Sequence, residues 1–171
     1  MGDNMNKKFK SYILCGILFV SILGTLAHFL YNWSGQNLVI GLFTPVNEST
    51  WEHIKLIFFP MLIYTQVLIK IFEKNYPCIK SASYIGILVG FILIPIIFYT
   101  YTGILEFHLL CLDIATFLVS VFLSFGVIYW LSKSCHFSSL EKTARFLILL
   151  LTFLFFIFTF FPPAIQLFAQ P

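Results

Sequence analysis

The sequence predicts an all-α membrane protein, a polytopic bundle of about five transmembrane helices. Hydrophobic residues make up 60% of the 171-residue chain and charged residues only 10%, whereas soluble domains carry about 25% charge. The mean hydropathy is +0.95, and a water-soluble fold could not cover that much apolar surface. We therefore count the chain in membrane crossings of roughly 20 residues each, and we expect one integral membrane domain over residues 1–171.

Five apolar stretches, separated by short polar segments, are each long enough to cross a hydrocarbon core of about 30 Å. They cover Ser11–Leu30, Ile54–Phe72, Ser83–Tyr101, Leu109–Leu131 and Arg145–Leu167. The first stretch is longer than the apolar region of a signal peptide, which has about 7 to 15 residues, so we expect a retained helix. The second helix should begin ahead of its apolar stretch, because Thr44 and Pro45 make a favourable N-cap and first helical position.

The basic residues predict the orientation, because Lys and Arg in short loops stay on the cytoplasmic side. Nine of the ten precede the first stretch or lie around the connections from the second stretch to the third and from the fourth to the fifth, and Lys55 is the exception. The N-terminus is therefore expected in the cytoplasm and the C-terminus outside. This topology accounts for the net charge of +3, so we expect the lipid bilayer and no nucleic acid as a partner.

The four cysteines fall into two pairs. Cys15 and Cys111 lie within apolar stretches, whereas Cys78 and Cys135 lie in predicted cytoplasmic loops. Disulfides are rare in the cytoplasm, so we expect unpaired thiols. The alternative is that Cys78 and Cys135, which share a side of the membrane, meet.

Polar residues concentrate at the predicted outer surface. The segment that leads into the second helix contributes Asn47, Glu48, Ser49, Trp51, Glu52, His53 and Lys55, and a helix there would place Glu48, Glu52 and Lys55 on one stripe. His28 lies near the outer end of the first helix, and Glu106, His108 and Asp113 lie near the start of the fourth. Ionisable groups at membrane depth usually face a bundle interior or a cavity, so Asp113 is the best single indication of a functional interior.

Imidazole and carboxylate groups gathered at one surface could bind a divalent metal such as zinc. We take His28, His53 and His108 as candidate metal ligands. The candidate catalytic residues are Glu48, Glu52 and Asp113, any of which could act as a general base on metal-bound water. Other candidate binding residues are Asn47, Ser49, Trp51, Lys55 and Glu106. The spacing is not diagnostic, because Glu52 and His53 do not form the His-Glu-x-x-His pattern.

Three motifs carry a resemblance to a known family. They are His28-Phe29-x-Tyr31-x-Trp33-Ser34-Gly35, Pro45-Val46-Asn47-Glu48-Ser49-x-Trp51-Glu52-His53 and Phe161-Pro162-Pro163. With these motifs the whole chain resembles a family of small multi-pass membrane proteins, mainly from Firmicutes, that is catalogued as a domain of unknown function. The resemblance implies a bacterial plasma membrane and a family signature at its outer face, and it implies no activity.

The sequence leaves the function open between several classes. We expect an integral membrane protein of unassigned activity with an extracytoplasmic polar pocket that could bind metal. One alternative is a membrane-embedded metal-dependent hydrolase whose small-molecule or lipid substrate approaches from the outer leaflet. A second is a protein that binds or transports a small solute or protons. A third is an accessory structural protein, in which Lys55 neutralises Glu48 or Glu52 and the histidines satisfy buried partners.

Overall fold

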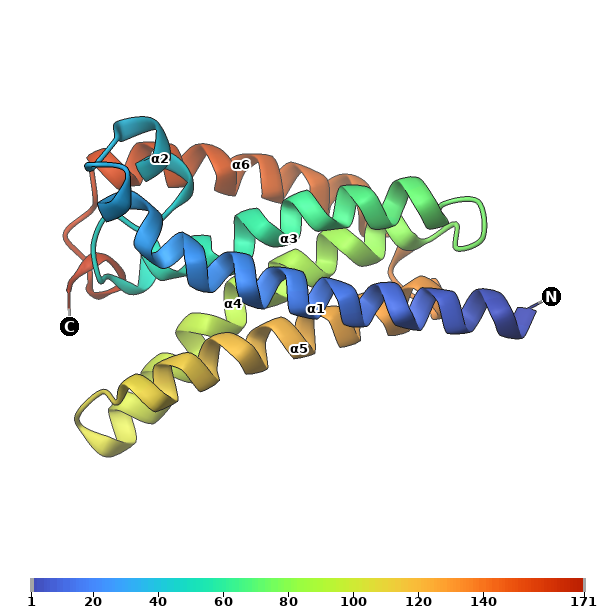
Figure 1. Ribbon diagram of the computed structural model, residues 1–171, viewed down its shortest axis with the longest axis horizontal. Helices are drawn as coiled ribbons and strands as arrows, with labels where there is room; N and C mark the ends of the chain where they lie inside the picture. Colours follow the sequence, from blue (N-terminus) through green and yellow to red (C-terminus); the bar gives the residue numbers. More distant parts are fainter. Residues whose placement is uncertain (1, 171) are drawn as a thin grey trace.

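The computed structural model describes residues 2–170, which form six α-helices and two short 3₁₀ helices (Figure 1). Their bounds are α1 (Gly2–Trp33), α2 (Leu38–Phe43), α3 (Thr50–Phe72), α4 (Ile79–Leu105), α5 (Leu110–Ser134), η1 (Ser138–Leu140), α6 (Glu141–Phe160) and η2 (Gln166–Phe168). Helices α1 and α3 to α6 are long and apolar enough to cross a membrane. The predicted all-α bundle with five such helices is confirmed, and α2 is an additional short helix.

The two chain ends lie at opposite ends of the bundle (Figure 1), as an odd number of crossings requires. One end carries α2, the loop between α4 and α5, and the C-terminal segment. We call it the outer end, following the orientation predicted from the basic residues. The opposite, inner end carries the N-terminus and the connections from α3 to α4 and from α5 to α6.

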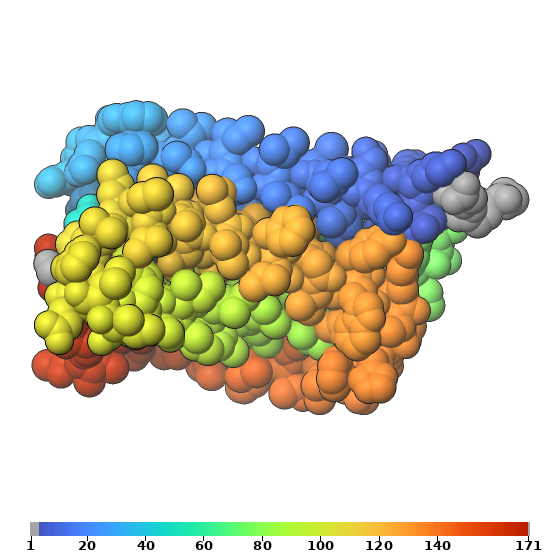
Figure 2. All heavy atoms as spheres, turned by 90° about the horizontal axis from the view of Figure 1, so that it is seen from below, coloured from blue at the N-terminus to red at the C-terminus, as the bar shows by residue number. Residues whose placement is uncertain are grey.

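Helix α3 occupies the centre of the bundle. Its most apolar window is 67% buried, whereas the corresponding windows of the other four long helices are 17% to 39% buried. Ile54, Ile57, Phe58, Met61 and Leu68 have no exposed surface, and their spacing of three or four residues repeats along the helix. Helices α1 and α4 pack against α3, while α5 packs against both α1 and α4 (Figure 2). Helix α6 lies against α4.

Helices α4 and α5 form an antiparallel hairpin with a close contact near its inner end. A Cβ atom added at Gly86 would lie 2.3 Å from a side-chain carbon of Ile128 and 3.1 Å from the carbonyl oxygen of Ser124. Glycine fits there without displacing Ile128, and its missing side chain allows the two helices to approach closely. At the outer end, Glu106 has a φ of 63°, and this left-handed conformation ends α4.

Large apolar side chains cover the outside of the bundle. Leu14, Leu18 and Ile22, spaced four residues apart on α1, are 60%, 62% and 60% exposed. Such a stripe is unfavourable in water, because each exposed side chain of this size forgoes about 1.5 to 3 kcal/mol of burial. It is the expected surface of a helix that faces lipid.

The expectation of unpaired thiols is wrong for two of the four cysteines. Cys78, which precedes α4, and Cys135, which follows α5, form a disulfide with their Cα atoms 5.3 Å apart. Sequence spacing could not decide the pairing, because it depends on how α4 packs along α5. Cys15 and Cys111 are free and exposed on the surface of the bundle.

Two predicted helix boundaries also differ from the structure. Thr44 does not begin the second helix; it is the C-cap of α2, and the N-cap of α3 is Ser49, whose hydroxyl accepts a hydrogen bond from the Glu52 amide. Helix α5 begins at Leu110, within one residue of the predicted Leu109, whereas α6 ends at Phe160, ahead of the predicted Leu167. Two consecutive prolines follow that end at positions 162 and 163, and the residue before a proline disfavours helical dihedrals.

Candidate functional site

A cavity of about 360 Å³ opens among α1, α3, α4 and α5 at the outer end. Its volume lies within the range of about 300 to 1,000 Å³ that is typical of small-molecule sites. Five ionisable side chains and an apolar wall line it together with Thr50, Leu110, Thr116 and Gln170. The ionisable residues are His28, Glu48, His53, His108 and Asp113, and the apolar wall is Leu56, Ile94, Phe98 and Phe117.

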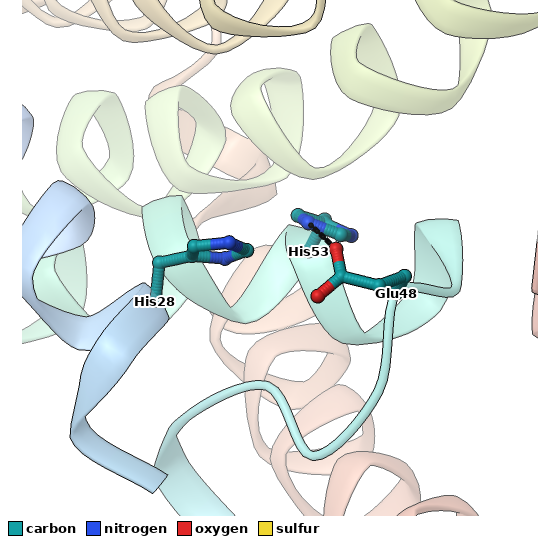
Figure 3. Close-up of side chains that lie close together, drawn as sticks. All are labelled: His28, Glu48 and His53. Carbon is teal, nitrogen blue, oxygen red and sulfur yellow. Dashed lines mark ion pairs between the residues drawn. The ribbon is translucent and has the colours of Figure 1, made fainter. Parts of the chain in front are cut away.

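Three of these ionisable residues form a compact group. His28 reaches in from the outer end of α1, His53 from the first turn of α3, and Glu48 from the loop before α3 (Figure 3). One potential ligand atom of each lies within 4.8 Å of the others, and His53 Nε2 is 3.3 Å from Glu48 Oε2. Ligands of a tetrahedral zinc ion with bonds of roughly 2.0 to 2.1 Å lie about 3.3 Å apart. A small inward movement of His28 would therefore complete a three-ligand set.

The hydrogen bonds of His53 decide which nitrogen faces the group. His53 Nδ1 is 3.0 Å from the carbonyl oxygen of Ser49. A carbonyl oxygen can only accept, so Nδ1 carries a proton and donates it, which leaves Nε2 with a lone pair in the neutral ring. Nε2 lies 3.3 Å from Oε2 of Glu48. Two acceptors this close are satisfied by a proton shared between them or by a metal ion.

His28 has an unsatisfied nitrogen in the same place. Its Nδ1 is buried and makes no hydrogen bond within the described residues, and its ring centroid lies 5.3 Å from that of His53. Most buried polar side-chain atoms in proteins have a partner. An orphaned imidazole nitrogen on a residue of this group is suited to metal coordination.

A set of short-range hydrogen bonds fixes the loop that carries Glu48. Asn47 Oδ1 accepts from the Ser49 amide at 2.9 Å, and Ser49 Oγ accepts from the Glu52 amide at 3.4 Å. Glu52 Oε2 in turn accepts from the Val46 amide at 3.0 Å. The residues on both sides of Glu48 are thus tied to the first turn of α3, and this turn also carries His53.

Behind the loop lies a buried ion pair between Glu52 and Lys55. Lys55 Nζ is 2.6 Å from Glu52 Oε2, and the two side chains are 0% and 2% exposed. The same ammonium group donates to Thr159 Oγ1 on α6 at 2.6 Å and to the carbonyl oxygen of Gly41 on α2 at 3.0 Å. Lys55 therefore joins α2, α3 and α6, and its own bonds engage it fully.

A second polar group lies on the α4–α5 side of the cavity. The Tyr101 hydroxyl donates a hydrogen bond to Asp113 Oδ1, and His108 Nδ1 lies 3.4 Å from Asp113 Oδ2. A carboxylate beside Nδ1 favours the tautomer with its lone pair on Nε2. His108 is half exposed, at 54%, and Asp113 is 32% exposed, so both can reach solvent or a ligand in the cavity.

Comparison with known proteins adds the family. A family model described as "Family of unknown function (DUF6512)" matches residues 1–171. The chain belongs to DUF6512. No curated protein matches it, and no solved structure does.

The DUF6512 structure separates the sequence-predicted candidates into three positions. Those that line the cavity are His28, Glu48, His53, His108 and Asp113. Those that hold the loop and α3 behind it are Asn47, Ser49, Glu52 and Lys55. Trp51 is buried against Phe155 of α6, and Glu106 is exposed in the α4–α5 loop, outside the residues that line the cavity.

The structure also brings in residues that sequence reasoning missed. Tyr101 contacts Asp113 across the α4–α5 hairpin, and Thr159 contacts both members of the buried ion pair. Neither contact has a periodic signal in the sequence, because each joins two different helices. Both partners could be placed only once the packing of this DUF6512 chain was known.

Proposed function

We propose that this protein is a membrane-embedded, metal-dependent hydrolase with its metal bound by His28, Glu48 and His53. The observation that carries the proposal is the grouping of His28, Glu48 and His53, with one potential ligand atom of each within 4.8 Å of the others and His53 Nε2 3.3 Å from Glu48 Oε2. The orphaned Nδ1 of His28 supports it. Two histidines and a carboxylate are a ligand set of catalytic zinc sites, which leave the fourth position open to water.

Two outer-shell contacts favour this assignment over a chance grouping. Metal-binding histidines usually donate their second nitrogen to a carbonyl or carboxylate, and this contact fixes the ring. His53 does so through Nδ1 to the Ser49 carbonyl. The loop hydrogen bonds around Glu48 likewise limit how far its carboxylate can move. The ligands are therefore largely pre-arranged.

The opposite wall of the cavity supplies a proton acceptor. A bound divalent metal lowers the pKa of its water toward neutrality. His108 would accept a proton from such a water on its Nε2, and Asp113 orients the imidazole through Nδ1. Tyr101 holds the Asp113 carboxylate in place by donating to its other oxygen. The residues thus resemble the base-and-orienter pairs of many hydrolytic enzymes.

The basic-residue asymmetry and the family resemblance support a location in the bacterial plasma membrane with the cavity on the outside. A substrate would then reach the metal from the outer leaflet or from the solution beyond it. Glu52 and Lys55 take no part in the chemistry. Their bonds to each other and to α2 and α6 support the loop instead.

Metal content tests the proposal directly. We expect protein purified in mild detergent and reconstituted with zinc to hold close to one equivalent by elemental mass spectrometry. His53→Ala should lose it, because the ligand set is then incomplete. His136→Ala is the matched control, since His136 is exposed at the inner end of the bundle, and it should keep the metal.

Folded wild-type protein that stays free of metal after reconstitution would contradict the proposal. It would leave a protonated His53 paired with Glu48 as the explanation of the contact. Asp113→Asn separates zinc binding from hydrolysis. It should retain zinc, because Asp113 is not a proposed ligand, while it slows hydrolysis, because Asp113 orients His108.

A further inference from the structure

The cavity is graded from polar to apolar along the helices that line it. The ionisable side chains come from the outer ends of the helices and from the loops beside them, whereas the apolar wall comes from deeper turns. At a rise of 1.5 Å per residue, Leu56 lies about 4.5 Å deeper than His53 on α3, and Phe117 lies about 6 Å deeper than Asp113 on α5. Phe98 is seven residues before the outer end of α4, which corresponds to roughly 10 Å.

The apolar end is closed below, and the cavity is open at its outer rim. A Cβ atom at Gly24 of α1 would lie 2.5 Å from the carbonyl oxygen of Leu56 and 2.6 Å from the Phe117 ring, so α1, α3 and α5 touch beneath the cavity. Leu110, at the outer rim on α5, is 74% exposed. A ligand can therefore enter at this rim with its apolar part directed toward the deeper wall and its polar group near the histidines.

The charged residues at the outer end favour some ligand head groups over others. Among the described residues this end carries four carboxylates, Glu48, Glu52, Glu106 and Asp113, and Lys55 as its single lysine or arginine. The ammonium group of Lys55 is buried and engaged by Glu52. Phosphate and sulfate groups are bound mainly by Arg and Lys, and no such residue lines the cavity. The two carboxylates that line it, Glu48 and Asp113, offset the charge of a divalent ion bound there. An uncharged head group meets no such obstacle.

We propose that the substrate is an uncharged acyl amphiphile, an ester or amide of a long-chain fatty acid, bound with its carbonyl at the histidines and its chain along Leu56, Ile94, Phe98 and Phe117. This inference rests on the proposed hydrolase function. Water adds to the carbonyl carbon, the bond to the alcohol or amine breaks, and the leaving group takes up the proton that His108 received. The products are a fatty acid and a neutral alcohol or an amine.

The test uses the zinc-loaded full-length protein in vesicles of ether-linked phosphatidylcholine, which contains no ester to compete. Three fluorogenic probes are compared: a dodecanoyl ester with an uncharged glycerol head, its acetyl counterpart, and the dodecanoyl ester with a phosphate head. We expect the uncharged dodecanoyl probe to be cleaved at least about tenfold faster than either of the others, since a few methylenes in a fitted apolar site give discrimination of this order.

A variant in the apolar wall tests whether the cavity distinguishes acyl chains by their length. Phe98→Ser should reduce the ratio of dodecanoyl to acetyl cleavage several-fold. Phe122→Ser is its matched control, because Phe122 lies on α5 at 62% exposure and does not line the cavity, and it should keep the wild-type ratio.

The outcomes separate this inference from the function on which it rests. Equal cleavage of the dodecanoyl and acetyl probes, or faster cleavage of the phosphate-headed probe, would overturn the substrate class and leave a metal-dependent hydrolase. A metal-loaded protein that cleaves none of the probes would also overturn it. Absence of metal, measured separately, would remove the proposed function itself.

Discussion

Replacing Lys55 by methionine should destabilise the protein strongly, because it leaves the Glu52 carboxylate buried without its counter-charge. Glu52 is 2% exposed and Lys55 is 0% exposed, with 2.6 Å between Oε2 and Nζ. Removing one member of a buried ion pair typically costs about 3 to 5 kcal/mol. The Gly41 carbonyl also loses its donor, and an unsatisfied buried acceptor adds about 1 to 3 kcal/mol. We therefore expect the free energy of unfolding to fall by at least about 3 kcal/mol.

Unfolding of this variant can be followed in mixed micelles by titration with a denaturing detergent. Trp51 is 4% exposed, whereas Trp33 and Trp130 are 67% and 58% exposed, so the change in tryptophan fluorescence reports mainly on the core near the ion pair. The double variant Glu52→Gln/Lys55→Met should be more stable than Lys55→Met alone, because it removes the uncompensated charge.

Lys70→Met provides the matched control on the same helix. Lys70 is exposed in the last turn of α3, where a basic residue contributes about 0.3 to 1 kcal/mol through the helix dipole. A Lys55→Met protein as stable as Lys70→Met, or a double variant no better than the single one, would refute the view that Glu52 and Lys55 are coupled charges.

Two further predictions concern helix packing and the disulfide. Gly86→Ala should destabilise the protein by about 1 to 3 kcal/mol through overpacking, because the new Cβ meets Ile128. Gly126→Ala should not, because no atom lies within 4 Å of its Cβ. Equal unfolding midpoints for the two variants would contradict this. Peptide mapping without reductant should recover Cys78 linked to Cys135, and each single serine variant should lower thermal stability as much as the double variant, since either one opens the bond.

Much of the fold could be predicted from the sequence because hydropathy alone determines which segments enter a membrane. The five apolar stretches correspond to α1 and α3 to α6. Helix ends were harder, because they depend on local hydrogen bonds. The Thr44-Pro45 pair has the composition of a helix start, yet Thr44 donates both its amide and its hydroxyl to the Ile40 carbonyl and so ends α2.

The sequence predicts which polar residues gather at the outer end, but it does not predict which of them contact one another. Glu52 and Lys55 were expected on one face of a helix, and they do pair at a separation of three residues. That this face is buried, and does not line the cavity, depends on Thr159, 107 residues from Glu52 along the chain. Glu48 was expected on the same stripe, but it lies in the loop before α3, and its contact with His53 follows from that loop.

The central position of α3 has a consequence for its insertion into the membrane during synthesis. Its apolar window has the lowest hydropathy of the five, 1.7 against 2.2 or more, and the highest burial. Charged residues are costly for an isolated span, and α3 leaves the ribosome long before α6 supplies Thr159 to Lys55. Lys55 on α3 therefore lacks its Thr159 partner until α6 has been synthesised. A chain truncated before α6 would hold Lys55 at the membrane with its hydrogen bonding incomplete.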